Sequence, residues 1–161
     1  MSNNFYNIEA RSYGLGGVAS HNFWVLRDDK GRVVTQLHGL ATDRSSNQFK
    51  PIGFFKDRLG FYEFKTAENH PTFISTKQKS VPVYQGEKED VLRRWENAAC
   101  EINRLNEKDL DYSPFGILGL PIVNSNSAFH LFAKLMDLPC YRFKGVLEPG
   151  ISNDLSKAVQ D

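Results

Sequence analysis

Three side chains of this sequence could together perform nucleophilic catalysis: His21, His38 and Ser125. Each histidine stands at one end of a short segment of aromatic and β-branched residues, and the serine follows an asparagine where an apolar periodic run begins. An imidazole can take the proton of a hydroxyl nucleophile, and a second imidazole can hold the first in the required tautomer. The pattern therefore suggests a Ser/His/His site that cleaves an amide or an ester.

A predicted β-hairpin places the two histidines. Residues 21–26 and 32–38 have strand composition, and Gly31 between them can supply the positive φ of a tight turn. A two- or four-residue turn puts His21 directly opposite His38, with Cβ atoms roughly 4.5–5.5 Å apart. The alternative is that both are semi-buried residues at strand ends, with ring nitrogens bonded to the backbone.

A predicted helix places the serine. It carries the apolar residues of the segment 128–136 and stops at Pro139. Four polar residues precede it: Asn124, Ser125, Asn126 and Ser127. A hydroxyl at a helix N-terminus lies where backbone N–H groups can stabilise an oxyanion, which makes Ser125 and Ser127 candidate nucleophiles. The alternative is a plain helix cap, since Asn and Ser are favoured N-cap residues.

The rest of the chain predicts a single α+β domain over residues 1–161, with an antiparallel sheet flanked by two or more helices. Residues 1–17 and 41–60 look like loops, and the 3.6-residue period from Glu87 to Leu105 predicts one helix of about five turns. Further strands are expected at residues 61–64, 71–74 and 81–84.

The order of these features resembles the circularly permuted papain-like hydrolases, the lecithin:retinol acyltransferase group and its NlpC-type relatives. In that family the nucleophile helix follows the sheet histidines and carries the motif Asn-Cys-x-x-Phe. Residues 124–129 are similar, with Ser125 in the cysteine position and Phe129 one residue late. The resemblance implies a permuted papain-like fold, His21 as the base and His38 as the orienting residue.

A serine in the cysteine position leaves two interpretations open. Because a hydroxyl is a weak nucleophile until a base takes its proton, the chain is either a serine hydrolase that depends on His21 or an inactive binding module. The first would act on a peptide or acyl substrate, with cell-wall crosslinks as the class that the resemblance favours. The second would bind a protein partner, for example as a bacterial effector, with the aromatic residues of the segment 49–64 as its surface.

Composition narrows the function classes. A net charge of +1 gives no basic footprint for nucleic acid, and no run approaches 18 apolar residues. The first ten residues have no secretory signal pattern, so we expect a protein made in the cytoplasm, with export by a dedicated system as an option.

We expect no cofactor and no metal. The two cysteines, Cys100 and Cys140, read as structural, and a grouping of His38 with Asp43, Glu68 and His70 lacks a metal-ligand spacing.

Overall fold

The computed structural model describes residues 4–16, 19–50, 52–65, 73–114 and 121–160. Its centre is a six-stranded antiparallel sheet in the order β4-β3-β2-β1-β6, with β5 paired to the remaining edge of β3. The strands are β1 (Phe5–Leu15), β2 (Ala19–Arg27), β3 (Val33–Thr42), β4 (Phe49–Lys50), β5 (Arg58–Lys65) and β6 (Lys79–Glu87). The helices are α1 (Lys88–Ala99), α2 (Ile102–Glu107), α3 (Ser125–Leu135) and α4 (Ser156–Val159). The predicted α+β class and antiparallel sheet are confirmed.

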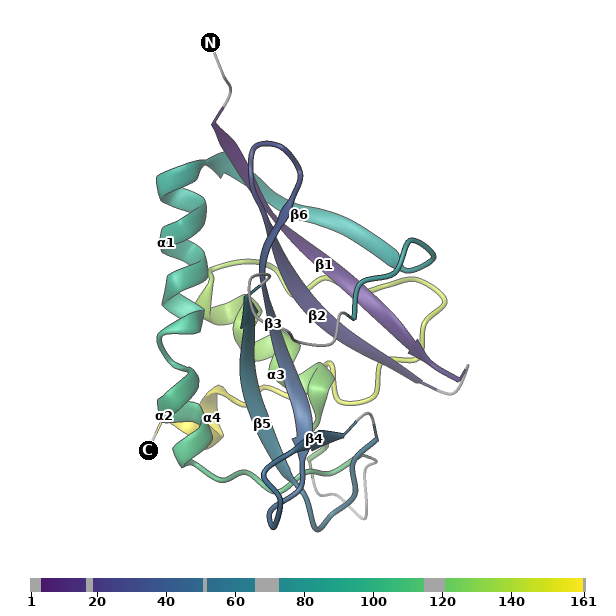
Figure 1. Ribbon diagram of the computed structural model, residues 1–161. Coiled ribbons are helices and arrows are strands. Elements are labelled where there is room, and N and C mark those ends of the chain that lie inside the picture. Colours follow the sequence, from purple (N-terminus) through teal and green to yellow (C-terminus); the bar gives the residue numbers. More distant parts are fainter. Residues whose placement is uncertain (1–3, 17–18, 51, 66–72, 115–120, 161) are drawn as a thin grey trace.

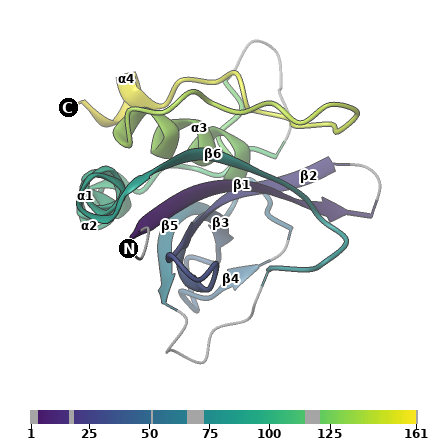
Figure 2. The same cartoon turned by 90° about the horizontal axis from the view of Figure 1, so that it is seen from above.

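The helices lie on one face of the sheet, which they cover together with the C-terminal segment (Figures 1 and 2). The core fills the space between them, and its central contact is the Trp24 indole of β2 stacked on the Phe129 ring of α3 at 4.3 Å between centroids. The indole Nε1 also donates to the Phe129 carbonyl. Large aromatic rings contribute most to burial, so this pair fixes α3 on the sheet.

The first strand was not predicted, because residues 1–17 read as a polar loop. Inside β1, the side chains of Glu9 and Arg11 are buried, and each is satisfied by ionic contacts: Glu9 pairs with both Arg11 and Arg27. The opposite face of the same strand carries Ile8 and Ala10, which are fully buried. Paired charges on one face therefore hid a central strand whose other face is apolar.

The predicted hairpin of β2 and β3 is confirmed, but the predicted register is wrong by two residues. Trp24 pairs with Leu37 and Val25 pairs with Gln36, so His21 does not lie directly opposite His38. Because successive side chains alternate between the two faces of a strand, an even offset leaves both imidazoles on the same face.

Pairing between β2 and β3 ends at Trp24 and Leu37, and beyond that point β2 diverges from β3. On the β3 side, β4 takes the vacated place and pairs with Ala41 and Thr42. On the β2 side, the free edge is bonded by residues from α3 and from the C-terminal segment, as described below. The sheet is thus split at one end, next to the start of α3.

The other predicted elements are confirmed with changes. Residues 61–64 and 81–84 lie within β5 and β6. Of the expected strand at 71–74, the first two positions lie outside the described residues, and Phe73 and Ile74 are not in a strand. The long helix predicted to end at Leu105 is interrupted at Cys100, because the Glu101 N–H bonds three residues back, to Ala98, and tightens the last turn.

Gly39 of β3 is where α3 comes closest to the sheet. A Cβ added at Gly39 would lie 2.2 Å from the Ala128 Cβ. We therefore expect Gly39→Ala to lower the free energy of unfolding by about 1–3 kcal/mol, because α3 must move away from the sheet. Urea denaturation measures this change. The matched control is Gly14→Ala in β1, where an added Cβ meets nothing within 4 Å, and equal effects of the two substitutions would contradict the packing.

Candidate functional site

The two predicted imidazoles contact each other. His21 Nε2 lies 2.8 Å from His38 Nδ1, and His38 Nε2 lies 2.9 Å from the Gln36 side-chain oxygen. Since that oxygen only accepts, His38 carries its proton on Nε2 and its Nδ1 accepts from His21. The sequence did not predict Gln36 as a partner, although it lies on the same face of β3 two residues before His38.

Both imidazoles are buried among aromatic rings. His21 stacks against Phe23 and His38, while His38 also contacts Phe23, Phe64 and Phe73. Burial lowers the pKa of His21 to about 3. Burial, followed by the charge of His21, holds the pKa of His38 well below its ordinary value. The pair is therefore neutral near pH 7.

Ser125 lies on the opposite side of the sheet from the imidazole pair. Side chains of β2 alternate, so Trp24, which stacks on α3, and His21, three positions away, point to opposite faces. On β3, Gly39 and its neighbour His38 likewise point to opposite faces. Gly39 is on the side of Ser125, since an ideal Cβ built at Gly39 lies 3.6 Å from the Ser125 Cα. Within the described chain, the hydrogen bonds of both imidazoles run to each other and to Gln36. The structure thus brings the two histidines together but does not bring Ser125 to them.

Two of the four polar residues at the start of α3 form its cap: Asn124, which precedes the helix, and Ser127 in its first turn. The Asn124 side chain accepts from the backbone N–H groups of Asn126 and Ser127. In return, the Ser127 hydroxyl bonds the Asn124 backbone, which completes a capping box. Ser127, the other candidate nucleophile, is fully buried in this arrangement.

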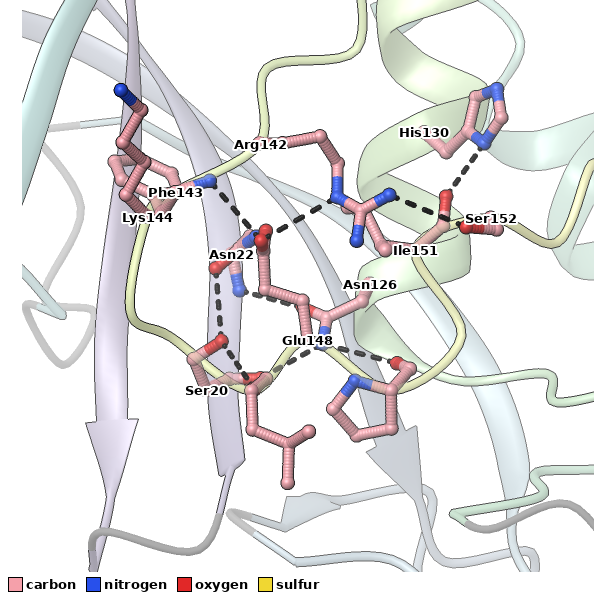
Figure 3. Close-up of polar contacts among 12 residues, drawn as sticks. Ser20, Asn22, Asn126, His130, Arg142, Phe143, Lys144, Glu148, Ile151 and Ser152 are labelled. Atoms are coloured by element: carbon pink, nitrogen blue, oxygen red, sulfur yellow. Dashed lines mark hydrogen bonds and ion pairs between the residues drawn. The ribbon is translucent and has the colours of Figure 1, made fainter.

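Asn126 bonds the free edge of β2 where the sheet splits. Its side-chain oxygen accepts from the Asn22 N–H at 3.0 Å, and its side-chain nitrogen donates to the Ser20 carbonyl at 3.0 Å and to the Pro149 carbonyl at 3.1 Å (Figure 3). An amide has the same donor and acceptor pair as a neighbouring strand, so Asn126 replaces the missing β3 partner. It also joins β2 to the C-terminal segment.

Glu148 is a buried residue of this region that the sequence did not single out. Its carboxylate accepts from the Asn22 side chain and from the Phe143 N–H, and it faces the Arg142 guanidinium (Figure 3). Its position in a polar tail gave no periodic signal. The Ser20 N–H and hydroxyl bond the Leu147 carbonyl next to it, so the segment 143–148 is fixed against β2.

Ser125 lines a cavity together with its neighbours Asn124 and Asn126. The Ser125 pocket, as we call it, has a volume of about 250 Å³ and is lined by Leu15, Ala19, Ser20, Ile52, Gly53, Tyr112, Pro114, Asn124, Ser125, Asn126 and Pro149. Both the hydroxyl and the backbone N–H of Ser125 interact with the Tyr112 hydroxyl. Burial raises the pKa of Tyr112 above its ordinary value, against those interactions, so the phenol stays protonated near pH 7.

The start of α3 supplies neither an available oxyanion hole nor a base. Three of its first N–H groups go to the chain's own acceptors: those of Asn126 and Ser127 to the Asn124 side chain, and that of Ala128 to the Asn124 carbonyl. The described residues that line the pocket include no His, Asp or Glu. Attack by the hydroxyl would need both groups.

The remaining candidates stay apart from this pocket. Burial raises the pKa of Cys140 to about 11, which keeps it a thiol, and the exposed Cys100 lies beyond the end of α1. The Asp43 carboxylate accepts from Ser45 and Ser46, while Glu68 and His70 lie outside the described residues. Across the described part of the chain, no three His, Cys, Asp or Glu gather as a metal site would require, and no helix is long and apolar enough to cross a membrane.

Comparison of the chain with protein-family models, curated proteins and solved structures finds no match. The resemblance to permuted papain-like hydrolases therefore stays a prediction from the residues that carry it.

Alanine substitutions should separate the motif residues by role. Asn124→Ala removes the cap and should lower the free energy of unfolding by about 1–2 kcal/mol. Asn126→Ala leaves the Asn22 N–H without its acceptor and should cost about 1–3 kcal/mol. Ser125→Ala should stay within about 0.5 kcal/mol of wild type. Denaturant unfolding of the three variants measures this order, and a loss at Ser125 as large as that at Asn126 would contradict it.

Acid should destabilise the fold through the imidazole pair. The unfolded chain binds a proton at His21 near pH 6.5, but the folded chain does so only near pH 3, so this contribution is fully present above pH 6.5 and is lost as pH falls toward 3. Between these values each such imidazole adds a slope of about 1.4 kcal/mol per pH unit.

Unfolding at several pH values measures that slope, and His21→Phe should reduce it by about one proton. Nitrogen-15 spectra of the rings provide the direct check. A folded-state titration of His21 near pH 6.5 would contradict the burial that the structure assigns to it.

Proposed function

We propose that the protein is a binding module without hydrolytic activity, and that the Ser125 pocket holds an apolar side chain of a protein partner. The observation that carries this proposal is that backbone N–H groups at the start of α3 are hydrogen-bonded within the chain. The N–H groups that would stabilise an oxyanion are bonded within the chain, and the imidazoles that would serve as bases are buried on the other face of the sheet.

The walls of the pocket support an apolar occupant. Its lining includes the apolar residues Leu15, Ile52, Pro114 and Pro149, while the polar residues Ser125 and Tyr112 lie next to each other. A volume of about 250 Å³ suits one large side chain better than an extended substrate. Small-ligand sites commonly combine apolar walls with a few convergent polar groups.

The rim of the pocket supports a protein as the partner. Ile52 is 61% exposed, and the two residues after Gly53, Phe54 and Phe55, are 59% and 51% exposed. Neighbouring exposed aromatic and aliphatic side chains are typical of protein-binding surfaces, since such groups contribute most of the binding energy when covered. The pocket and this rim form one apolar surface after β4.

The competing proposal is the serine hydrolase or acyltransferase that the sequence resemblance implies, and an activity-based probe distinguishes the two. A fluorophosphonate should label neither the wild type nor Ser125→Ala if the hydroxyl has no base. Labelling of the wild type that disappears in Ser125→Ala would overturn the binding-module proposal.

Binding itself can be tested with N-acetyl-leucinamide, a neutral probe with one apolar side chain. We expect it to shift the amide resonances of Ala19, Gly53 and Ser125 in a nitrogen-15 spectrum. Ile52→Ser removes apolar surface from the rim and should lower the affinity for the probe by about threefold or more, in line with the loss of one exposed aliphatic contact. Val34→Ser, at an exposed position of β3 away from the pocket, is the matched control. Shifts spread evenly over the surface would count against the pocket.

A further inference from the structure

A second groove lies beside the Ser125 pocket, where β1 ends and β2 begins. It has a volume of about 480 Å³, and we call it the lysine groove. Its lining consists of Ser12, Tyr13, Gly14, Ala19, Ser20, Ser75, Lys77, Gln78, Lys79, Gly145, Val146 and Leu147. Two ammonium groups, four hydroxyls and an amide thus share one groove, and the described residues that line it include no carboxylate.

The two lysines keep their charge available to a ligand. The Lys79 ammonium donates to the Lys144 carbonyl, a neutral acceptor, and the described residues place no carboxylate within ion-pair distance of Lys77 or Lys79. Two buried carboxylates of this region, Glu9 and Glu148, do not line the groove and are already paired. Glu9 contacts Arg11, and Glu148 faces Arg142.

Both walls of the groove are held in place by buried polar contacts. On one side, Arg11 bonds the Gln78 side chain and the Ser75 carbonyl, which fixes the turn that carries Lys77. On the other side, Glu148 and Ser20 fix the segment 143–148 (Figure 3). A groove whose walls do not need to be ordered on binding loses less conformational entropy to a ligand.

The lysine groove adjoins the Ser125 pocket. Ala19 and Ser20 line both cavities, so a ligand that crosses these two residues reaches from the ammonium groups to the apolar pocket. Tyr13, Val146 and the 65% exposed Leu147 add apolar surface along the way. A single ligand that fills both cavities would therefore carry negative charge at one end and an apolar group at the other.

We propose that the partner is an acidic peptide segment, whose carboxylates lie between Lys77 and Lys79 while a neighbouring apolar side chain enters the Ser125 pocket. This inference rests on the proposed binding function and adds the charge of the partner. Carboxylates complement the groove because it offers ammonium and hydroxyl donors, and the described residues that line it include no carboxylate that would repel them.

Two blocked pentapeptides test the inference. The first has two glutamates followed by glycine, leucine and glycine, and the second has glutamines in place of the glutamates. Titrated into the nitrogen-15-labelled protein at low salt, the acidic peptide should bind about fivefold more tightly than its neutral counterpart, the size expected of two partly exposed ion pairs. It should shift amides of both cavities, and about 1 M salt should remove its advantage because the Debye length is then about 3 Å.

The charge-reversed variant Lys77→Glu/Lys79→Glu should bind the two peptides equally or prefer the neutral one. Both lysines are exposed, so the fold should tolerate the change. Lys30→Glu/Lys157→Glu carries the same change in net charge at exposed positions outside the groove and is the matched control, which should keep the preference.

The outcomes separate this inference from the proposed function. If both peptides bind the Ser125 pocket equally well, the acidic partner is excluded while the binding function stands. If neither peptide shifts the residues of either cavity, both proposals are overturned.

Discussion

The side-chain amide of Asn126 joins three parts of the molecule that are distant in sequence. It completes the edge of β2 where β3 has diverged, it sits in the first turn of α3, and it reaches the Pro149 carbonyl of the C-terminal segment. A sheet edge buried beneath a helix must have its N–H and C=O groups bonded, because an unpaired buried group costs about 1–3 kcal/mol. The split in the sheet can exist only because this amide satisfies that edge.

The two cavities follow from the same split. Where β2 leaves β3, Ala19 and Ser20 face the start of α3 on one side and the segment 143–148 on the other. The polar residues that could have served catalysis are used to hold this opening in shape. Asn124, Asn126 and Ser127 bond backbone groups, and Ser125 lines the pocket with Tyr112 beside it.

The sequence predicted most of the elements and the contact between the imidazoles, because alternation within β2 and β3 sets which side chains share a face. It did not predict β1, whose Glu9 and Arg11 look exposed until their ionic partners are known. Nor could it relate Ser125 to His21. Which face of a sheet a distant helix covers depends on tertiary packing, here the stacking of Phe129 on Trp24, and no local pattern of the chain records that choice.

The central claim is that the imidazole pair and Ser125 lie on opposite faces of the sheet, and nuclear Overhauser contacts in solution test it most directly. The account predicts contacts from the ring protons of His21 and His38 to the rings of Phe23 and Phe73, and none to the β-protons of Ser125. Contacts from either imidazole to the Ser125 side chain would contradict it and would restore the three-residue catalytic site.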